Sequence, residues 1–246
     1  MPELRSTSRQ GGYTMIELVM VIIVIGILAA VATMKLTASL ETAKFEATRA
    51  EMEQLAFAIV GNAAIHASGA RDDFGYVGDV GAMPPNLDAL ATNPGYSTWN
   101  GPYISQNDDN DDFKKDAWNA EYIFFDTLLR SIGSGSDIDL VFASSTSALF
   151  ENTISGHLVD AGGIPPGAGH AGSLTVQLLY PDGVGGVAAA TSPVGNDGSF
   201  ILSDIPIGDH ILRAIYVPAA DTVEYNLNVN PGKEVFVTVA FPADLW

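Results

Sequence analysis

Cysteine is absent from the 246 residues of this sequence. Its absence excludes disulfides, and it also excludes the zinc and redox sites that are built from cysteine. Any part of the chain that lies outside the cytoplasm must therefore be stabilised by packing or by a metal alone. At this length the chain can bury a sizeable core, and it can form two small domains rather than one.

Basic residues are scarce, with 11 Lys and Arg against 29 Asp and Glu, which gives a formal net charge of −18. A surface this acidic repels the phosphates of DNA and RNA, so nucleic acid is not an expected partner. Two interpretations of the excess acid remain open, namely simple solubility and the collection of divalent cations.

Signals for catalysis are missing as well. The histidines are scattered, without the spacing of metal ligands or of a catalytic triad, at His66, His157, His170 and His210. No glycine-rich phosphate loop follows an expected strand. We therefore expect no catalytic residues, and a function other than that of an enzyme.

Charge is absent again between Leu18 and Met34. This apolar run has about the length that a helix needs to cross a bilayer. Arg5 and Arg9 precede it, which favours an N-terminus in the cytoplasm and the rest of the chain on the other side. A cleaved secretory signal is the alternative, since Ala29, Ala30 and Ala32 are similar to its cleavage site.

No proline interrupts the sequence between Pro2 and Pro84, and a helical pattern continues past the apolar run. Small or apolar residues recur at spacings typical of a helix, at Leu36, Leu40, Ala43, Ala47, Met52, Leu55 and Ile59. The pattern predicts one helix over residues 13–67, roughly 80 Å long. Its first half is apolar all round, and its amphipathic second half is expected to pack on a globular head.

Glu17 is an acid near the start of this apolar segment. A carboxylate in hydrocarbon is costly, so it should have a specific partner, and a simple membrane anchor gives no reason for one. Gly11-Gly12 and the run Tyr13-Thr14-Met15-Ile16-Glu17-Leu18 resemble the leader-peptidase site of type IV prepilins and pseudopilins. In that family a short basic leader ends in glycine, and a glutamate follows at the fifth mature position. Tyr13 stands where phenylalanine is commoner.

The resemblance implies processing and assembly. Prepilin peptidase would cut after Gly12, so residues 1–12 are a leader peptide and Tyr13 becomes an N-methylated N-terminus. Residues 18–34 would cross the inner membrane once, and would later form the core of an extracellular or periplasmic filament. Implied partners are copies of this chain or other pilin subunits, the peptidase, the inner-membrane assembly platform and the membrane.

In such a filament Glu17 gains a role. Its carboxylate would pair with the Tyr13 amine of a neighbouring subunit, and because both charges sit in a poor solvent, each is stabilised mainly by the other. The pair would then fix the register of the subunits rather than add much net stability. Pairing of Glu17 with the N-terminus of its own chain is the alternative.

Residues 68–160 are predicted to form a head with a small antiparallel sheet. Within it, residues 84–139 resemble the head of the major pseudopilin of type II secretion systems. The matching residues are Pro84 or Pro85 before Leu87 and Leu90, the run Trp99–Tyr103, and the run Asp116–Tyr122, in which Ala117 and Asn119 replace the usual proline and glycine.

The pseudopilin resemblance implies a calcium-binding loop at residues 131–139. Ser134, Asp137 and Asp139 would supply oxygen ligands of the kind that calcium prefers. A second candidate cluster consists of Asp108, Asp109, Asp111 and Asp112, which lacks the turn glycine and closing glutamate of an EF-hand. The alternative for both clusters is that they are solvated acids in turns.

The C-terminal part has a different composition. Residues 161–172 are rich in glycine and proline and are predicted to be a linker, and residues 173–246 alternate between short apolar runs and turns, which predicts a β-sandwich. Asn196–Phe200 and Ile205–His210 resemble elements of carboxypeptidase-regulatory-like, or transthyretin-like, domains, which are generally noncatalytic. Residues expected to point inward are Val223, Tyr225, Leu227, Val229, Val235, Val237, Val239 and Phe241.

Together these patterns predict an α+β protein, with a long N-terminal helix, a small antiparallel head and a β-sandwich. The expected function is that of a structural subunit in a type IV pilus or a pseudopilus-like filament. Two alternatives remain. The first is a minor, tip-located or membrane-anchored adhesin that binds through the β-sandwich. The second is a secreted enzyme, and the missing active site argues against it.

Overall fold

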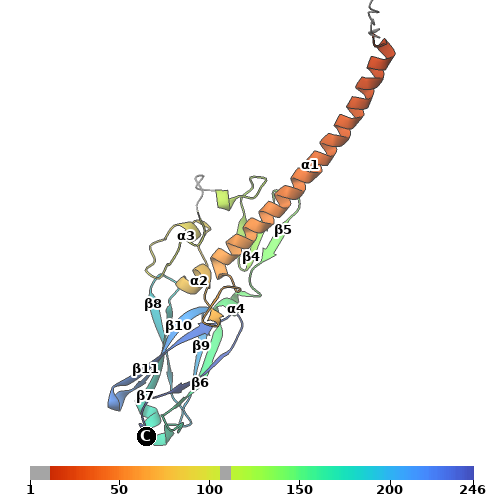
Figure 1. Ribbon diagram of the computed structural model, residues 1–246. Helices are drawn as coiled ribbons and strands as arrows, with labels where there is room; N and C mark the ends of the chain where they lie inside the picture. The colour runs from red at the N-terminus through yellow and green to blue at the C-terminus, as the bar shows by residue number, and fades with distance from the viewer. Residues whose placement is uncertain (1–11, 106–111) are drawn as a thin grey trace, which may run out of the picture. The chain divides into compact units, whose positions relative to one another are not determined.

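The structure is a computed structural model that describes residues 12–105 and 112–246. It has the expected α+β composition, with one long helix followed by antiparallel sheets (Figure 1). The chain divides into two compact units, Met1–Glu46 and Ala47–Trp246. Each unit is described by itself. The predicted leader, residues 1–12, lies outside the described residues except for Gly12.

The first unit contains most of helix α1, which spans Met15–Val60. From Met15 onward the side chains of this unit are exposed, apart from a half-buried Lys44. The hydroxyl groups of Thr33, Thr37 and Thr42 donate to backbone carbonyls four residues earlier. Threonines are therefore accommodated in this helix without leaving a hydroxyl unsatisfied.

The second unit begins with the last turns of α1. Met52, Leu55 and Ile59 are fully buried there, which confirms the predicted amphipathic face. The helix ends at Val60 rather than at residue 67, because Gly61 adopts a left-handed conformation with φ of 77°. A side chain at Gly61 would collide with the Asp73 carbonyl, since its Cβ would lie 2.2 Å from that oxygen.

The head is built from short elements around this helix end. Strands β3, β4 and β5 form an antiparallel sheet in that order, which confirms the predicted small β head. The elements of the head are β1 (His66–Ala67), β2 (Ala70–Arg71), α2 (Gly75–Val80), α3 (Asp88–Ala91), η1 (Asp112–Lys114), β3 (Ile123–Phe125), β4 (Leu128–Ser131), β5 (Ile138–Val141) and α4 (Thr146–Phe150).

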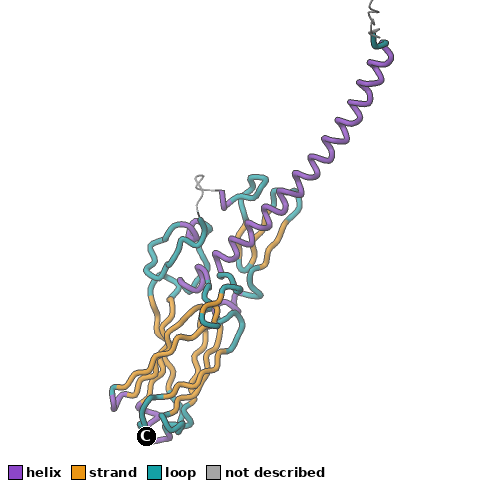
Figure 2. The backbone as a smooth tube through the Cα atoms, in the orientation of Figure 1, coloured by secondary structure: helices purple, strands orange, loops and turns teal. Residues whose placement is uncertain are grey.

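The C-terminal part forms two facing sheets (Figure 2). One has the order β11-β10-β7-β8, and the other has the order β12-β6-β9, in which β12 and β6 are parallel. Their bounds are β6 (Asn152–Val159), α5 (Gly167–His170), η2 (Ala171–Ser173), β7 (Leu174–Pro181), β8 (Val187–Pro193), β9 (Ser199–Ile205), β10 (Gly208–Tyr216), η3 (Val217–Ala219), β11 (Asp221–Val229) and β12 (Val235–Ala240).

The predicted inward alternation is confirmed in β11 and at β12, where Leu227, Val229, Val239 and Phe241 are buried and the intervening side chains are more exposed. Residues 161–172 are not a bare linker, since they contain α5 and the start of η2.

Strand β6 lies in residues that the sequence places in the head, yet it is the middle strand of the second sheet. Its buried positions are Asn152, Ile154, Gly156 and Leu158. Asn152 and Gly156 are not large apolar residues, so the alternation of apolar side chains is interrupted at both. Gly156 is needed because a Cβ there would lie 2.1 Å from the Val237 carbonyl oxygen and 2.7 Å from the Phe200 ring. A strand patterned in this way does not show the period expected of apolar residues.

The head and the β-sandwich share one packed core. Ile207, in the turn between β9 and β10, is fully buried in the hydrophobic cluster of the head. Its backbone N–H donates to the Leu149 carbonyl at 2.8 Å. The Gly183 N–H donates to Val80 O at 2.9 Å, and Ser97 Oγ donates to Gly185 O at 2.6 Å. The β-sandwich is therefore a packed part of the second unit rather than a tethered module.

Replacing Ile207 by alanine should lower the free energy of unfolding of the second unit by about 2–5 kcal/mol, because it opens a cavity in the core of the head. Ile201→Ala is the matched control, since Ile201 on β9 is 60% exposed. Denaturant unfolding of the full-length protein in detergent, followed by tryptophan fluorescence, measures both variants. Superimposable curves for the two would contradict the shared core.

Candidate functional site

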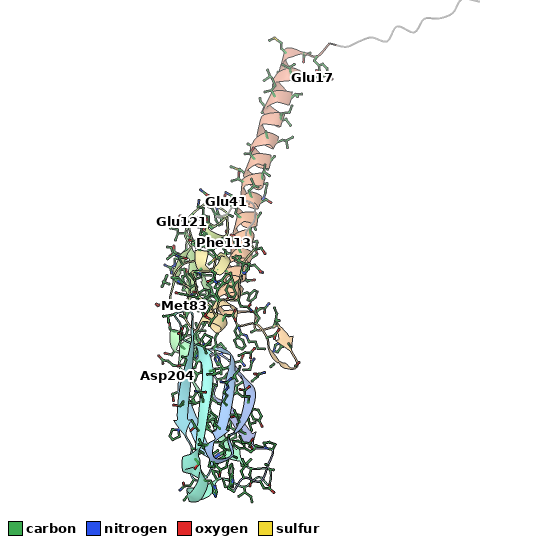
Figure 3. All side chains as sticks on the ribbon, turned by 90° about the vertical axis from the view of Figure 1, so that its left-hand side faces the viewer. Glu17, Glu41, Met83, Phe113, Glu121 and Asp204 are labelled. Carbon is green, nitrogen blue, oxygen red and sulfur yellow. The ribbon has the colours of Figure 1, made fainter. Side chains whose placement is uncertain are left out.

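The start of α1 holds the residues predicted for processing and assembly. Gly12 and Tyr13 precede the helix without regular structure, and both are exposed. Thr14 occupies the N-cap position, where its Oγ1 accepts a hydrogen bond from the Glu17 N–H at 3.3 Å. Figure 3 shows Glu17 at this end of the helix.

Thr14 and Glu17 have the spacing of a capping box, in which a threonine N-cap precedes a glutamate at the third helical position. Sequence reasoning assigned no role to Thr14, although this spacing is a recognisable signal. The positive end of the helix dipole favours a carboxylate in the first turn. Local structure therefore contributes to the stability of Glu17 but leaves its side chain exposed.

The surface that follows Glu17 is apolar and uncovered. Most large side chains along it are more than half exposed, including Ile22 at 60%, Ile25 at 59% and Leu28 at 64%. By length and composition, α1 is able to cross a membrane. Exposed apolar area of this extent requires a membrane or other apolar helices to cover it.

The run Asp116–Tyr122 fastens the last turns of α1 to the head. The Ala117 N–H donates to the buried Thr48 Oγ1 at 3.1 Å, and the Tyr122 hydroxyl donates to Glu51 Oε2 at 2.7 Å. Burial and the hydrogen bond to Glu51 both raise the pKa of Tyr122, which keeps the phenol protonated. Asn119 adopts a positive φ of 69°, which asparagine tolerates better than most residues, and so it replaces the usual glycine.

Asp116 is the polar centre of this region and is only 5% exposed. Its carboxylate accepts hydrogen bonds from Ser131 Oγ at 2.6 Å, from Gly133 N at 3.0 Å, and from the Trp118 and Ala120 N–H groups at 2.9 Å each. Burial alone would raise the pKa of Asp116, but these donors hold it below its ordinary value. The carboxylate thus ties two turns of the head together.

The predicted calcium ligands lie close to this centre but do not form a cation cage. Arg130 binds Asp139 through Nε at 2.6 Å and Nη2 at 2.7 Å, and it binds Asp137 through Nη1 at 2.9 Å. This hydrogen bonding lowers the pKa of Asp139. Ser134 Oγ donates to the Ser136 carbonyl at 2.6 Å, so it is engaged within its own turn.

Calcium takes six to eight oxygen ligands, and these side chains do not fit that requirement while a guanidinium holds both carboxylates. In residues 12–105 and 112–246, no three acidic or histidine side chains are arranged to hold a metal ion. Of the second candidate cluster, Asp108, Asp109 and Asp111 lie outside the described residues, and Asp112 opens η1. Calcium binding stays a prediction.

Comparison with known families gives one match. The family described as a prokaryotic N-terminal methylation motif matches residues 7–33. The matched segment contains Gly12, Tyr13 and Glu17, and it extends over the apolar first half of α1. The chain therefore carries a prepilin-type N-terminal motif, and the motif and helix together support a type IV pilin-like protein.

No curated protein matches the chain. Among solved structures, the dioxygenase domain of a dioxygenase carbohydrate-binding protein fusion from Streptomyces sp. SirexAA-E is 14% identical, with a TM-score of 0.30, over 42% of this chain and 86% of its own. A DUF3823 family protein from Parabacteroides merdae is 23% identical, with a TM-score of 0.27, over 37% of this chain and 46% of its own.

BcpA, the major pilin subunit of Bacillus cereus, is 10% identical, with a TM-score of 0.26, over 51% of this chain and 42% of its own. Likenesses with such low TM-scores carry no argument about function.

Replacing Asp116 by asparagine should lower the free energy of unfolding by about 2–3 kcal/mol at neutral pH, because an amide cannot accept from the same donors as a charged carboxylate. Since the pKa of Asp116 is lower in the folded state, its contribution is present above the unfolded value of about 4 and is lost as the pH falls through the folded value. The difference between wild type and variant should therefore shrink in acid.

Asp126→Asn is the matched control, since Asp126 is exposed and its positive φ of 48° suits asparagine. Thermal unfolding of the three proteins across a pH series checks the prediction. A stability difference for Asp116→Asn that stays constant below pH about 4 would rule out the charged carboxylate as its source.

Proposed function

We propose that this chain is a structural subunit of a filament of the type IV pilus or type II secretion pseudopilus class, cut by prepilin peptidase after Gly12 and polymerised through residues 18–34. One observation carries the proposal. The methylation motif matched over residues 7–33 coincides with an exposed apolar helix in which Glu17 is the one acid before Glu41.

A membrane span of this kind serves first to hold the subunit. A helix satisfies its own backbone groups in hydrocarbon, and the apolar residues from Leu18 to Met34 are suited to that solvent. Arg5 and Arg9 favour a cytoplasmic leader, where the peptidase would act, and they direct residues 47–246 to the opposite side. The inner membrane is thus the proposed location before assembly, and an external or periplasmic filament is the location after it.

Assembly replaces lipid by the helices of other subunits. Both surroundings are apolar, so covering the helix with neighbours gains little from water exclusion, and close packing and polar contacts have to determine how subunits fit. Cleavage would create an amine at Tyr13 that bears positive charge. Pairing of that amine with Glu17 of an adjoining subunit satisfies two charges that are each costly alone.

Intact-mass analysis of the mature protein tests the processing step. We expect a chain that begins at Tyr13 and carries one added methyl group, with residues 18–34 retained, because prepilin-type cleavage occurs before the apolar segment. In cells that lack the peptidase, the protein should keep the mass of the uncleaved precursor. A mature chain that begins beyond residue 29 would show that the apolar segment is an ordinary secretory signal.

Glu17→Ala tests the assembly step. The variant should remain in the membrane, because it makes the span more apolar. Filament yield should fall at least about tenfold, because the Tyr13 amine of the adjoining subunit would lack a counter-charge, at a cost of about 1.4 kcal/mol or more at each addition. Glu41→Ala is the control, since Glu41 is an exposed acid further along the same helix, with Oε1 4.0 Å from Lys44 Nζ (Figure 3). Sheared-filament yield and membrane content measure both. Normal yield from Glu17→Ala would remove the role given to this acid.

A further inference from the structure

The outer face of the head sheet carries a guanidinium between two carboxylates. Arg130 on β4 and Asp139 on β5 are directly opposite each other in the antiparallel pair, and Asp137 precedes β5. All three side chains are partly exposed. Arg130 therefore joins the strand on one side of the β4–β5 turn to both acids on the other side.

The geometry uses the whole guanidinium. Nε and Nη2 donate to the two oxygens of Asp139, and Nη1 lies 2.9 Å from Asp137 Oδ2. A planar fork of this kind matches carboxylates better than a point charge does. Without the guanidinium, Asp137 and Asp139 would be neighbouring like charges on one edge of the hairpin, and they would repel each other.

The rest of the turn is also fixed without a metal. Asp116 accepts hydrogen bonds from Ser131 Oγ and from Gly133 N where the chain leaves β4. Ser134 Oγ then donates to the Ser136 carbonyl and accepts from the Ser136 N–H at 3.3 Å. Hydrogen bonds within the chain thus fix the geometry of the turn, and Arg130 supplies the positive charge that the two carboxylates need.

We propose that Arg130 is the built-in cation of the β4–β5 hairpin, so that the head keeps its fold without a divalent metal at the place where the pseudopilin resemblance implies calcium. The inference concerns the head alone and does not depend on filament formation. A covalently attached cation cannot be lost by dilution or chelation, so the stability of this hairpin does not depend on the calcium concentration around it.

The test compares thermal unfolding of full-length protein in detergent, with EDTA or with CaCl2. Wild type should unfold at the same temperature in both. Arg130→Gln should lower that temperature by a few degrees, and the charge exchange R130D/D139R should recover much of the loss, because the exchanged arginine again faces a carboxylate across the strands. Arg213→Gln is the matched control, since Arg213 also pairs across strands, with Glu224, through Nε alone at 2.6 Å, and it should lower the temperature less.

Calorimetric titration with CaCl2 gives a direct second readout, in which we expect no saturable binding that depends on Asp139. Three results would each overturn the proposal: a drop in the wild-type unfolding temperature in EDTA, calcium binding that Asp139→Asn abolishes, or a charge-exchanged protein no more stable than Arg130→Gln.

Discussion

A single carboxylate in an apolar helix is the constraint on which the account of this protein depends. Glu17 lies in the first turn of α1, ahead of a segment with no charge until Lys35. Thr14 caps the helix through the Glu17 backbone and leaves the carboxylate exposed. In hydrocarbon that group requires a cation, and a processed N-terminus of an adjoining subunit is the proposed source. Membrane insertion, processing and polymerisation then become consequences of one segment.

The second unit shows how the last turns of α1 are held by the head. The last turns of α1 are buried in the head, and Thr48 and Glu51 bind the run Asp116–Tyr122. Arg71 donates from Nε to the Asp73 carbonyl and from Nη2 to the Val60 carbonyl, so it satisfies a carbonyl that the helix end leaves free. Ile207 carries the same core into the β-sandwich. The β-sandwich is therefore held at a fixed place on the head.

Two arginines of this unit hold turns together through hydrogen bonds and ion pairs. Arg71 does so at the end of α1, and Arg130 does so between Asp137 and Asp139. A chain without cysteine cannot fasten such turns with disulfides, so packing and charged hydrogen bonds have to do it.

Sequence periodicity predicts which side chains of a regular helix or strand are buried. The buried face of Met52, Leu55 and Ile59 follows from helical spacing, and the inward side chains of β11 follow from alternation. It could not predict β6, because Asn152 and Gly156 occupy inward positions there for reasons of hydrogen bonding and close approach. Nor could it predict that Arg130 would face Asp139, since strand register decides which side chains meet. The Thr14 cap is predictable from the sequence, because Thr14 and Glu17 have the spacing of a capping box.

The most direct measurement of the central claim is a cryo-electron-microscopy map of filaments from cells that make this protein, at a resolution that shows side chains. We expect that the chain fills the filament density, with the Tyr13 amine of one subunit within ion-pair distance of the Glu17 carboxylate of a neighbour. Filaments that lack this chain, or a Glu17 carboxylate directed only at its own N-terminus, would contradict it.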